Sequence, residues 1–266
     1  MKLTVLVDNN TYIDRYYHGE PAVSYYLEDE DIKLLFDVGY SDIYLKNALA
    51  MGIDLSDIDK IAISHGHNDH TRGLLFLPEF KHDVQIVAHP DTFKHKMYQG
   101  EDIGSPLSFD ELKEKYTLSL SKEAVKLSNN ITYLGEIPIS QDFEQRYAIG
   151  ECLSEDGYRK DTMLDDSAIV YKCDKGLFVI TGCSHSGICN IIEYAKKVCC
   201  DKRIYGVIGG FHLFENDDRL QATIDYLDKN KIGLLYPCHC VSLEAKIAMA
   251  NKLKINEVGV GLVLEI

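Results

Sequence analysis

Short apolar runs alternate along the chain with amphipathic stretches of helical periodicity. The runs are rich in β-branched residues and end at polar residues or glycine, which is typical of strands. In the first third of the sequence they predict strands over 3–7, 23–27, 33–36, 60–63 and 84–87. A helix is expected over 41–51, with Ser41 as its cap and Gly52 after its last turn.

The second half of the sequence repeats this order of strands and crossover helices. Apolar runs predict strands over 168–171, 177–181, 204–208, 233–235 and 258–264, and helical patterns cover 187–198, 217–227 and 243–253. Two halves of similar order favour an α/β fold in which two mixed sheets pack face to face with helices outside, a four-layer αββα sandwich. No linker separates the halves, so a single domain over 1–266 is expected.

Residues 91–165 are less regular than the two halves that flank them. They include Pro106, Pro138 and several glycines among polar and aromatic residues. Irregular segments of this length inside a compact domain are usually lids or binding segments. We therefore expect a loop-rich insertion at about 91–165 that takes part in substrate binding.

The composition excludes several classes of protein. The 28 Lys and Arg against 42 Asp and Glu give a net charge of −14, whereas nucleic-acid binding normally requires a basic surface, so no nucleic-acid partner is expected. No apolar run approaches the length of a membrane span or a signal-peptide core, which predicts a cytoplasmic protein without membrane contact. All eight cysteines lie in the second half, a pattern that favours free thiols or metal ligands over disulfides.

The strongest chemical signal is the segment 64–70, S-H-G-H-N-D-H, directly after the predicted strand 60–63. Neutral imidazole and carboxylate are ligands that divalent zinc, iron and manganese prefer. The spacing lets His65 and His67 reach one ion while Asp69 and His70 reach a second. A polar surface loop that collects metal without chemistry is the alternative.

Four ligands in one loop cannot complete two metal sites, so other parts of the chain must contribute. Three histidines follow short apolar strands, where α/β sheets present functional groups, and these are His185, His212 and His239. Metal ligand, proton donor and core histidine are all open roles for His212. Cys183 is either a thiolate ligand or a small buried thiol.

The pattern H-X-H-X-D-H over 65–70 resembles the signature of the metallo-β-lactamase superfamily. Segment 35–39 is similar to the superfamily's first motif, whose aspartate, here Asp37, organises the metal loop by hydrogen bonds; a simple strand cap is the alternative. Segments 182–190, 209–213 and 238–240 resemble the dihydropterin methyl ribofuranosylaminobenzene phosphate synthase-like group, which includes a synthase and predicted metal-dependent hydrolases.

The resemblance implies a metallo-β-lactamase-type sandwich with a dinuclear metal site. Cys183 stands where relatives often carry a bridging aspartate, and His185 is the nearest replacement for a third histidine that residues 96–182 lack. The implied metal ligands are His65, His67, Asp69, His70, Cys183, His185 and His239.

Two divalent ions, expected to be zinc with manganese or iron as alternatives, would activate a bridging water. The expected reaction is hydrolysis of an ester, lactone or phosphoester in a small-molecule substrate, with Asp69 and His212 as catalytic residues. A transferase acting on a pterin diphosphate-like substrate is the alternative. A diiron redox protein or a non-catalytic metal binder is a further one. The N–H groups that begin helix 187–198 are expected either to hold a phosphate or to be capped by a serine, Ser184 or Ser186.

Overall fold

The computed structural model describes residues 1–30 and 32–266, so Asp31 of the acidic run 28–31 lies outside the described residues. The chain forms two compact units, each assembled from segments that are distant in the sequence. Unit 1 comprises residues 1–122, 147–165 and 259–266, and unit 2 comprises residues 123–146 and 166–258. The single domain over 1–266 stays a prediction.

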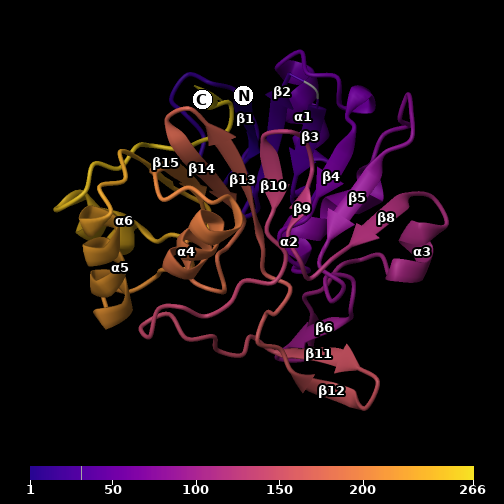
Figure 1. The fold of residues 1–266 in the computed structure, drawn as a ribbon. Coiled ribbons are helices and arrows are strands. Elements are labelled where there is room, and N and C mark those ends of the chain that lie inside the picture. Colours follow the sequence, from indigo (N-terminus) through magenta and orange to yellow (C-terminus); the bar gives the residue numbers. More distant parts are fainter. Residues whose placement is uncertain (31) are drawn as a thin grey trace. The chain divides into compact units, whose positions relative to one another are not determined.

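Unit 1 is built on a seven-stranded mixed sheet (Figure 1). Strands β3, β4, β5 and β8 run parallel, and β1, β2, β3 and β17 pair antiparallel. In spatial order the strands are β17 (Val263–Glu265), β1 (Lys2–Val7), β2 (Ser24–Asp29), β3 (Ile32–Phe36), β4 (Lys60–Ala62), β5 (Gln85–Ala88) and β8 (Thr117–Leu120). The helices of this unit are α1 (Ile43–Ala50), α2 (Asn68–Thr71) and α3 (Phe109–Lys113), with 3₁₀ turns η1 (Leu55–Asp57) and η2 (Arg72–Phe76).

A small antiparallel sheet also belongs to unit 1. Its strands, in spatial order, are β12 (Gly157–Lys160), β11 (Glu151–Ser154), β6 (Lys96–Tyr98) and β7 (Glu101–Asp102), and Figure 1 shows β6, β11 and β12 side by side. Segment 91–165 is therefore more regular than the sequence pattern suggests. Strands of two to four residues are too short for a period of two to register in the sequence.

Unit 2 contains a six-stranded sheet whose parallel part carries crossover helices. In spatial order its strands are β16 (Leu234–Pro237), β15 (Ile204–Gly209), β14 (Gly176–Thr181), β13 (Ala168–Cys173), β10 (Ile131–Tyr133) and β9 (Val125–Lys126). The helices are α4 (Ile188–Val198), α5 (Asp218–Lys229) and α6 (Leu243–Ala250). Helix α4 packs against β14 through a buried face that includes Ile188, Ile191 and Ala195, as its apolar spacing predicts.

The mixed α/β class is confirmed, and most predicted elements lie within two residues of their observed bounds. Two predictions are wrong in detail. The N-cap position of α1 is Asp42 and not Ser41, although the Ser41 hydroxyl accepts the N–H of Ile43 at 3.3 Å. The last strand is shorter than 258–264, because Val260 forms only an isolated bridge to Thr11 and the ladder resumes at Val263.

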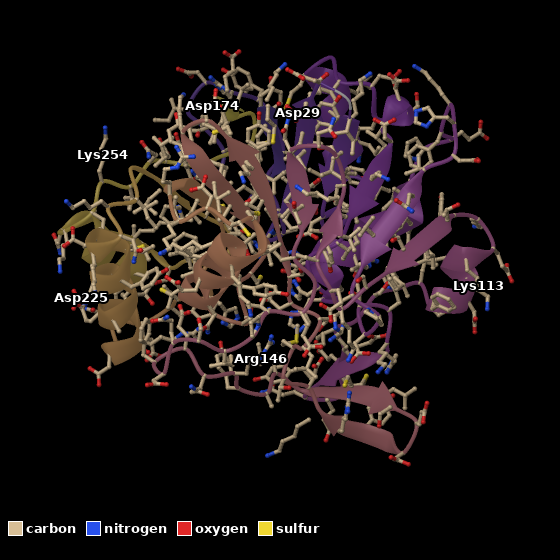
Figure 2. All side chains as sticks on the ribbon, viewed as in Figure 1. Asp29, Lys113, Arg146, Asp174, Asp225 and Lys254 are labelled. Carbon is tan, nitrogen blue, oxygen red and sulfur yellow. The ribbon has the colours of Figure 1, made fainter. Side chains whose placement is uncertain are left out.

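Charged side chains such as Asp174, Asp225 and Lys254 are exposed (Figure 2). None of the eight cysteines is in a disulfide in the part of the chain that the structure describes. Among the described residues, no helix is both long enough and apolar enough to cross a membrane.

Candidate metal centre

The end of strand β3 organises residues 64–70 of unit 1, which we call the histidine loop. Asp37 follows β3 in the left-handed backbone region, at φ 57°, and its carboxylate is buried. Oδ1 accepts the N–H of Ser64 at 2.7 Å, and Oδ2 accepts the hydroxyl of Ser64 and Nδ1 of His70, each at 2.7 Å. The structure therefore assigns Asp37 to organising the loop, which decides between the two roles left open by the sequence.

The side chains of the histidine loop converge within unit 1. Nε2 of His65 lies 3.1 Å from Nδ1 of His67, and the rings of His65 and His70 lie 4.2 Å apart between centroids. Oδ2 of Asp69 lies 3.4 Å from Nε2 of His70, and the Asp69 side chain is 27% exposed to solvent. Three imidazoles and one partly exposed carboxylate are thus gathered in one place, a donor set suited to divalent zinc, iron or manganese.

Burial and neighbouring charges set the protonation of these imidazoles. Burial lowers the pKa of His67 to about 4, so its ring is neutral at pH 7, the form that binds a metal ion. For His70, burial lowers the pKa, but the carboxylates of Asp69 and Asp37 outweigh it and hold the pKa well above its usual value. A cation that binds His70 would therefore displace a proton.

Close packing fixes the backbone of the loop at Gly66. A Cβ at this position would lie 2.1 Å from the carbonyl oxygen of Thr92 and 2.9 Å from Cε of Lys96. The Gly66 N–H donates to Oδ2 of Asp165 at 2.8 Å. Only glycine fits here, because another segment approaches the backbone and not because of a positive φ.

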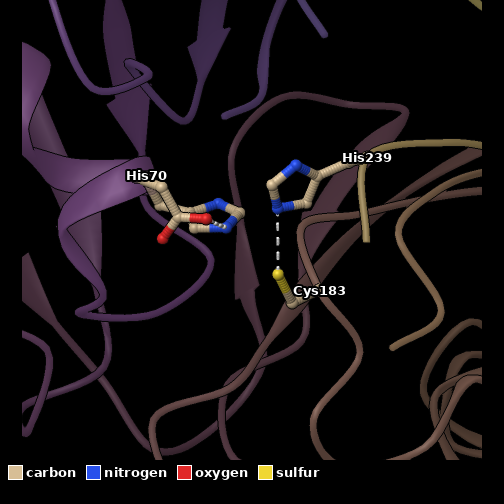
Figure 3. A group of neighbouring side chains, drawn as sticks. His70, Cys183 and His239 are labelled. Atoms are coloured by element: carbon tan, nitrogen blue, oxygen red, sulfur yellow. Dashed lines mark hydrogen bonds and ion pairs between the residues drawn. The ribbon is translucent and has the colours of Figure 1, made fainter. Parts of the chain in front are cut away.

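Unit 2 presents a second set of donors at the ends of its parallel strands. Cys183 follows β14 and His239 follows β16, and both side chains are buried. Nε2 of His239 lies 3.2 Å from Sγ of Cys183, the interaction that is dashed in Figure 3. The buried Cys183 thiol is therefore in polar contact with an imidazole.

His185 and His212 form a second pair in unit 2. Their rings lie 4.4 Å apart between centroids, with His185 buried and His212 half-buried. His212 and His239 both have φ 50°, a left-handed conformation that non-glycine residues adopt at a cost and that clusters at functional sites. The His212 ring also contacts the half-exposed Phe214, at 4.7 Å between centroids.

The start of α4 corrects a prediction and reveals a residue that the sequence did not indicate. No serine side chain caps the helix, and the buried carboxylate of Glu144 already binds two N–H groups of its first turn. Oε1 and Oε2 of Glu144 accept the N–H groups of Cys189 at 3.1 Å and Asn190 at 2.9 Å. Ser186 instead donates its N–H and hydroxyl to Asp166.

Comparison with known proteins identifies the family. A sequence model of the metallo-beta-lactamase superfamily matches residues 19–149. The 7,8-dihydropterin-6-methyl-4-(β-D-ribofuranosyl)-aminobenzene-5'-phosphate synthase of Methanocaldococcus jannaschii is 31% identical over 234 residues, which cover 84% of this chain and 80% of the synthase. The chain belongs to the metallo-β-lactamase superfamily. The resemblance to the synthase-like group is thereby confirmed.

Two further superfamily relatives match along nearly the whole chain. An uncharacterised protein of M. jannaschii is 32% identical over 264 residues, covering 97% of this chain and 98% of that protein. A crystal structure described as that of a metal-dependent hydrolase of the β-lactamase superfamily is 29% identical and superposes with a TM-score of 0.86, covering 100% of this chain and 99% of the other. The metallo-β-lactamase-type fold is therefore confirmed.

Superfamily proteins of this kind hold divalent metals, and the donor chemistry of both units fits such ions. The assignment of individual ligands, and of Asp69 and His212 as catalytic residues, stays a prediction.

Proposed function

We propose that this chain is a metal-dependent hydrolase with a dinuclear metal centre. The proposed ligands are His65, His67, Asp69, His70, Cys183, His185 and His239. The observation that carries the proposal is the donor chemistry at the ends of the strands: buried imidazoles and the partly exposed Asp69 carboxylate in unit 1, and buried imidazoles with the Cys183 thiol in unit 2. These are the ligand types of zinc, with manganese and iron as alternatives.

The bound ions and the protein side chains would have different roles in the reaction. When bound, the two ions would lower the pKa of a shared water, so that hydroxide is available near neutral pH for attack on an ester, lactone or phosphoester of a small molecule. Asp69 is the one carboxylate of the histidine loop, is partly exposed, and would accept the proton of that water. His212, half-buried against His185, would donate a proton to the leaving group.

A transferase is the second candidate, favoured by the 31% identity to the dihydropterin-related synthase. In that case the same ligands would hold ions that stabilise a diphosphate leaving group. Glu144 already binds two N–H groups of the first turn of α4, so other groups would have to bind the diphosphate. The two candidates differ in whether water alone suffices as the acceptor.

The test measures bound metal and turnover in the same samples. Protein purified without oxygen is analysed for zinc, manganese and iron and then assayed with phosphoesters, lactones, esters and pterin diphosphates. His67→Ala should lower metal content and turnover together, whereas His82→Ala, which changes an exposed histidine, should alter neither. Full metal content and turnover in His67→Ala would contradict the assignment.

A further inference from the structure

A buried ion cluster in unit 1 contains no candidate metal ligand. Lys96, the first residue of β6, is 1% exposed, and its Nζ donates to Oδ2 of Asp161 at 2.6 Å and to Oδ1 of Asp165 at 3.0 Å. Both carboxylates are buried. Removing one cation and two anions from water is unfavourable unless each group keeps its partners, so the cluster has one defined arrangement.

Asp165 joins this cluster to the histidine loop. Its two carboxylate oxygens have different tasks: Oδ1 faces Lys96, whereas Oδ2 accepts the Gly66 N–H at 2.8 Å. Gly66 is the residue between His65 and His67. The Lys96 side chain also packs directly against Gly66, where an added Cβ would meet its Cε at 2.9 Å.

The loop is tied to the same segment at a second point. The N–H of Asn68 donates to the carbonyl of Ile103 at 2.8 Å, and the N–H of Ile103 donates to the carbonyl of Lys96 at 3.0 Å. The backbone N–H groups of Gly66 and Asn68 are thus hydrogen-bonded to residues next to the small sheet. The imidazoles belong to the neighbouring residues His65 and His67.

We propose that Lys96 and Asp165 are positioning residues, which fix the directions of the His65 and His67 side chains by holding the backbone at Gly66. Lys96 orients the Asp165 carboxylate, and the carboxylate orients the peptide between the two histidines. Asp161 balances the charge of Lys96, but its second oxygen accepts the N–H of Met163 at 2.9 Å and not that of a loop residue. The proposal rests on the metal centre proposed above.

Because two carboxylates contact Lys96, the cluster allows a matched pair of variants. An asparagine has one side-chain oxygen, so Asp165→Asn cannot serve both Lys96 and Gly66. In Asp161→Asn the one remaining oxygen must likewise serve either Lys96 or the Met163 N–H, but the acceptor of the Gly66 N–H is unchanged. Zinc affinity, measured by competition with a chromophoric chelator, should fall at least about 10-fold further in Asp165→Asn than in Asp161→Asn, as is usual for groups that orient metal ligands.

A second measurement needs no metal. Amide hydrogen exchange at Gly66 should be faster in metal-free Asp165→Asn than in metal-free Asp161→Asn, because only in the former must the Gly66 N–H compete with Lys96 for one side-chain oxygen. Equal zinc affinities and equal exchange in the two variants would overturn the proposal. A wild-type protein that binds no zinc would overturn the metal centre instead, and the exchange measurement would still decide the role of Asp165.

Asp165→Glu keeps the buried negative charge and replaces Asp165→Asn in both measurements if that variant does not fold. Asp165→Glu retains an anion for Lys96, but its extra methylene moves the carboxylate away from its present place at Gly66. We expect the same loss of zinc affinity and the same faster exchange. Wild-type values for both in Asp165→Glu would equally overturn the proposal.

Discussion

Nδ1 of His70 donates a hydrogen bond to Oδ2 of Asp37 across 2.7 Å, and both side chains are fully buried. A hydrogen bond at one ring nitrogen determines which nitrogen remains to bind a metal, so Asp37 directs Nε2 of His70 toward the other donors of the loop. The same carboxylate accepts hydrogen bonds from the backbone N–H and the hydroxyl of Ser64. One residue at the end of β3 therefore sets both the start of the histidine loop and the orientation of its last imidazole.

Asp37→Asn should weaken metal binding although Asp37 is not a ligand. The amide has one acceptor oxygen in place of two, so either the Ser64 N–H or the His70 ring loses its acceptor, and in both cases the histidine loop is held less firmly. We expect zinc affinity to fall about 10–100-fold and the free energy of unfolding of the metal-free protein to fall by about 1–3 kcal/mol. Chelator competition and urea unfolding measure the two effects.

Ser24→Ala is the matched control for this change. The Ser24 hydroxyl is buried and donates to the backbone carbonyl of Asp37 at 2.9 Å, so the variant perturbs the same turn without touching the carboxylate. It should lower stability but leave zinc affinity near that of the wild type. If Asp37→Asn bound zinc as tightly as Ser24→Ala, the orienting role of Asp37 would be wrong.

The sequence predicts those parts of the site that are local. The histidine loop is contiguous, and Asp37 directly follows an apolar strand, so pattern and spacing suffice for both. Glu144 and the Lys96 cluster could not be predicted in this way, because Glu144 acts 45 residues away at Cys189, and Asp165 acts 99 residues away at Gly66. Buried polar groups with distant partners leave no periodic signal, and only the folded chain brings the partners together.

Cys183→Ser should remove a sulfur ligand, since a serine hydroxyl does not ionise as a metal-bound thiol does. Cobalt-substituted wild-type protein should show a thiolate-to-cobalt charge-transfer band, and Cys183→Ser should lack it and bind metal less tightly. Cys240→Ser is the control, because Sγ of Cys240 lies only 3.6 Å from the Cys183 carbonyl oxygen. A band that persists in Cys183→Ser, or disappears in Cys240→Ser, would exclude Cys183 as the ligand.

Glu144 should make stability depend on pH. Burial raises the pKa of Glu144 above its ordinary 4.5, although the N–H groups of Asn190 and Cys189 act in the opposite direction. The folded state thus holds the proton more tightly than the unfolded chain, so this contribution to the free energy of unfolding is complete below pH 4.5 and is lost as pH rises through the folded-state pKa.

In Glu144→Gln the side chain has no titratable carboxyl group, so comparison with this variant isolates the contribution of Glu144 to the pH dependence of stability. The free energy of unfolding of the wild type, relative to this variant, should decrease from about pH 4.5 towards neutrality in urea titrations of metal-free protein. Glu79→Gln, an exposed substitution, should show no such trend. A difference that grows with pH would mean that the ionised carboxylate is the stabilised form.

Alanine substitutions at two glycines with positive φ distinguish the cost of backbone strain from the cost of displacing the Glu144 carboxylate. Gly52 has φ +73° and open space where a Cβ would lie, with nothing within 4 Å, so Gly52→Ala should cost only the left-handed strain, about 1–2 kcal/mol. Gly187 has φ +92°, and a Cβ there would lie 2.4 Å from Oε2 of Glu144. Gly187→Ala should therefore cost about 1–3 kcal/mol more, because it also displaces the carboxylate that binds the N–H groups of α4. Urea unfolding of the metal-free variants measures both losses. Equal losses would mean that Glu144 moves aside without losing its hydrogen bonds to the start of α4.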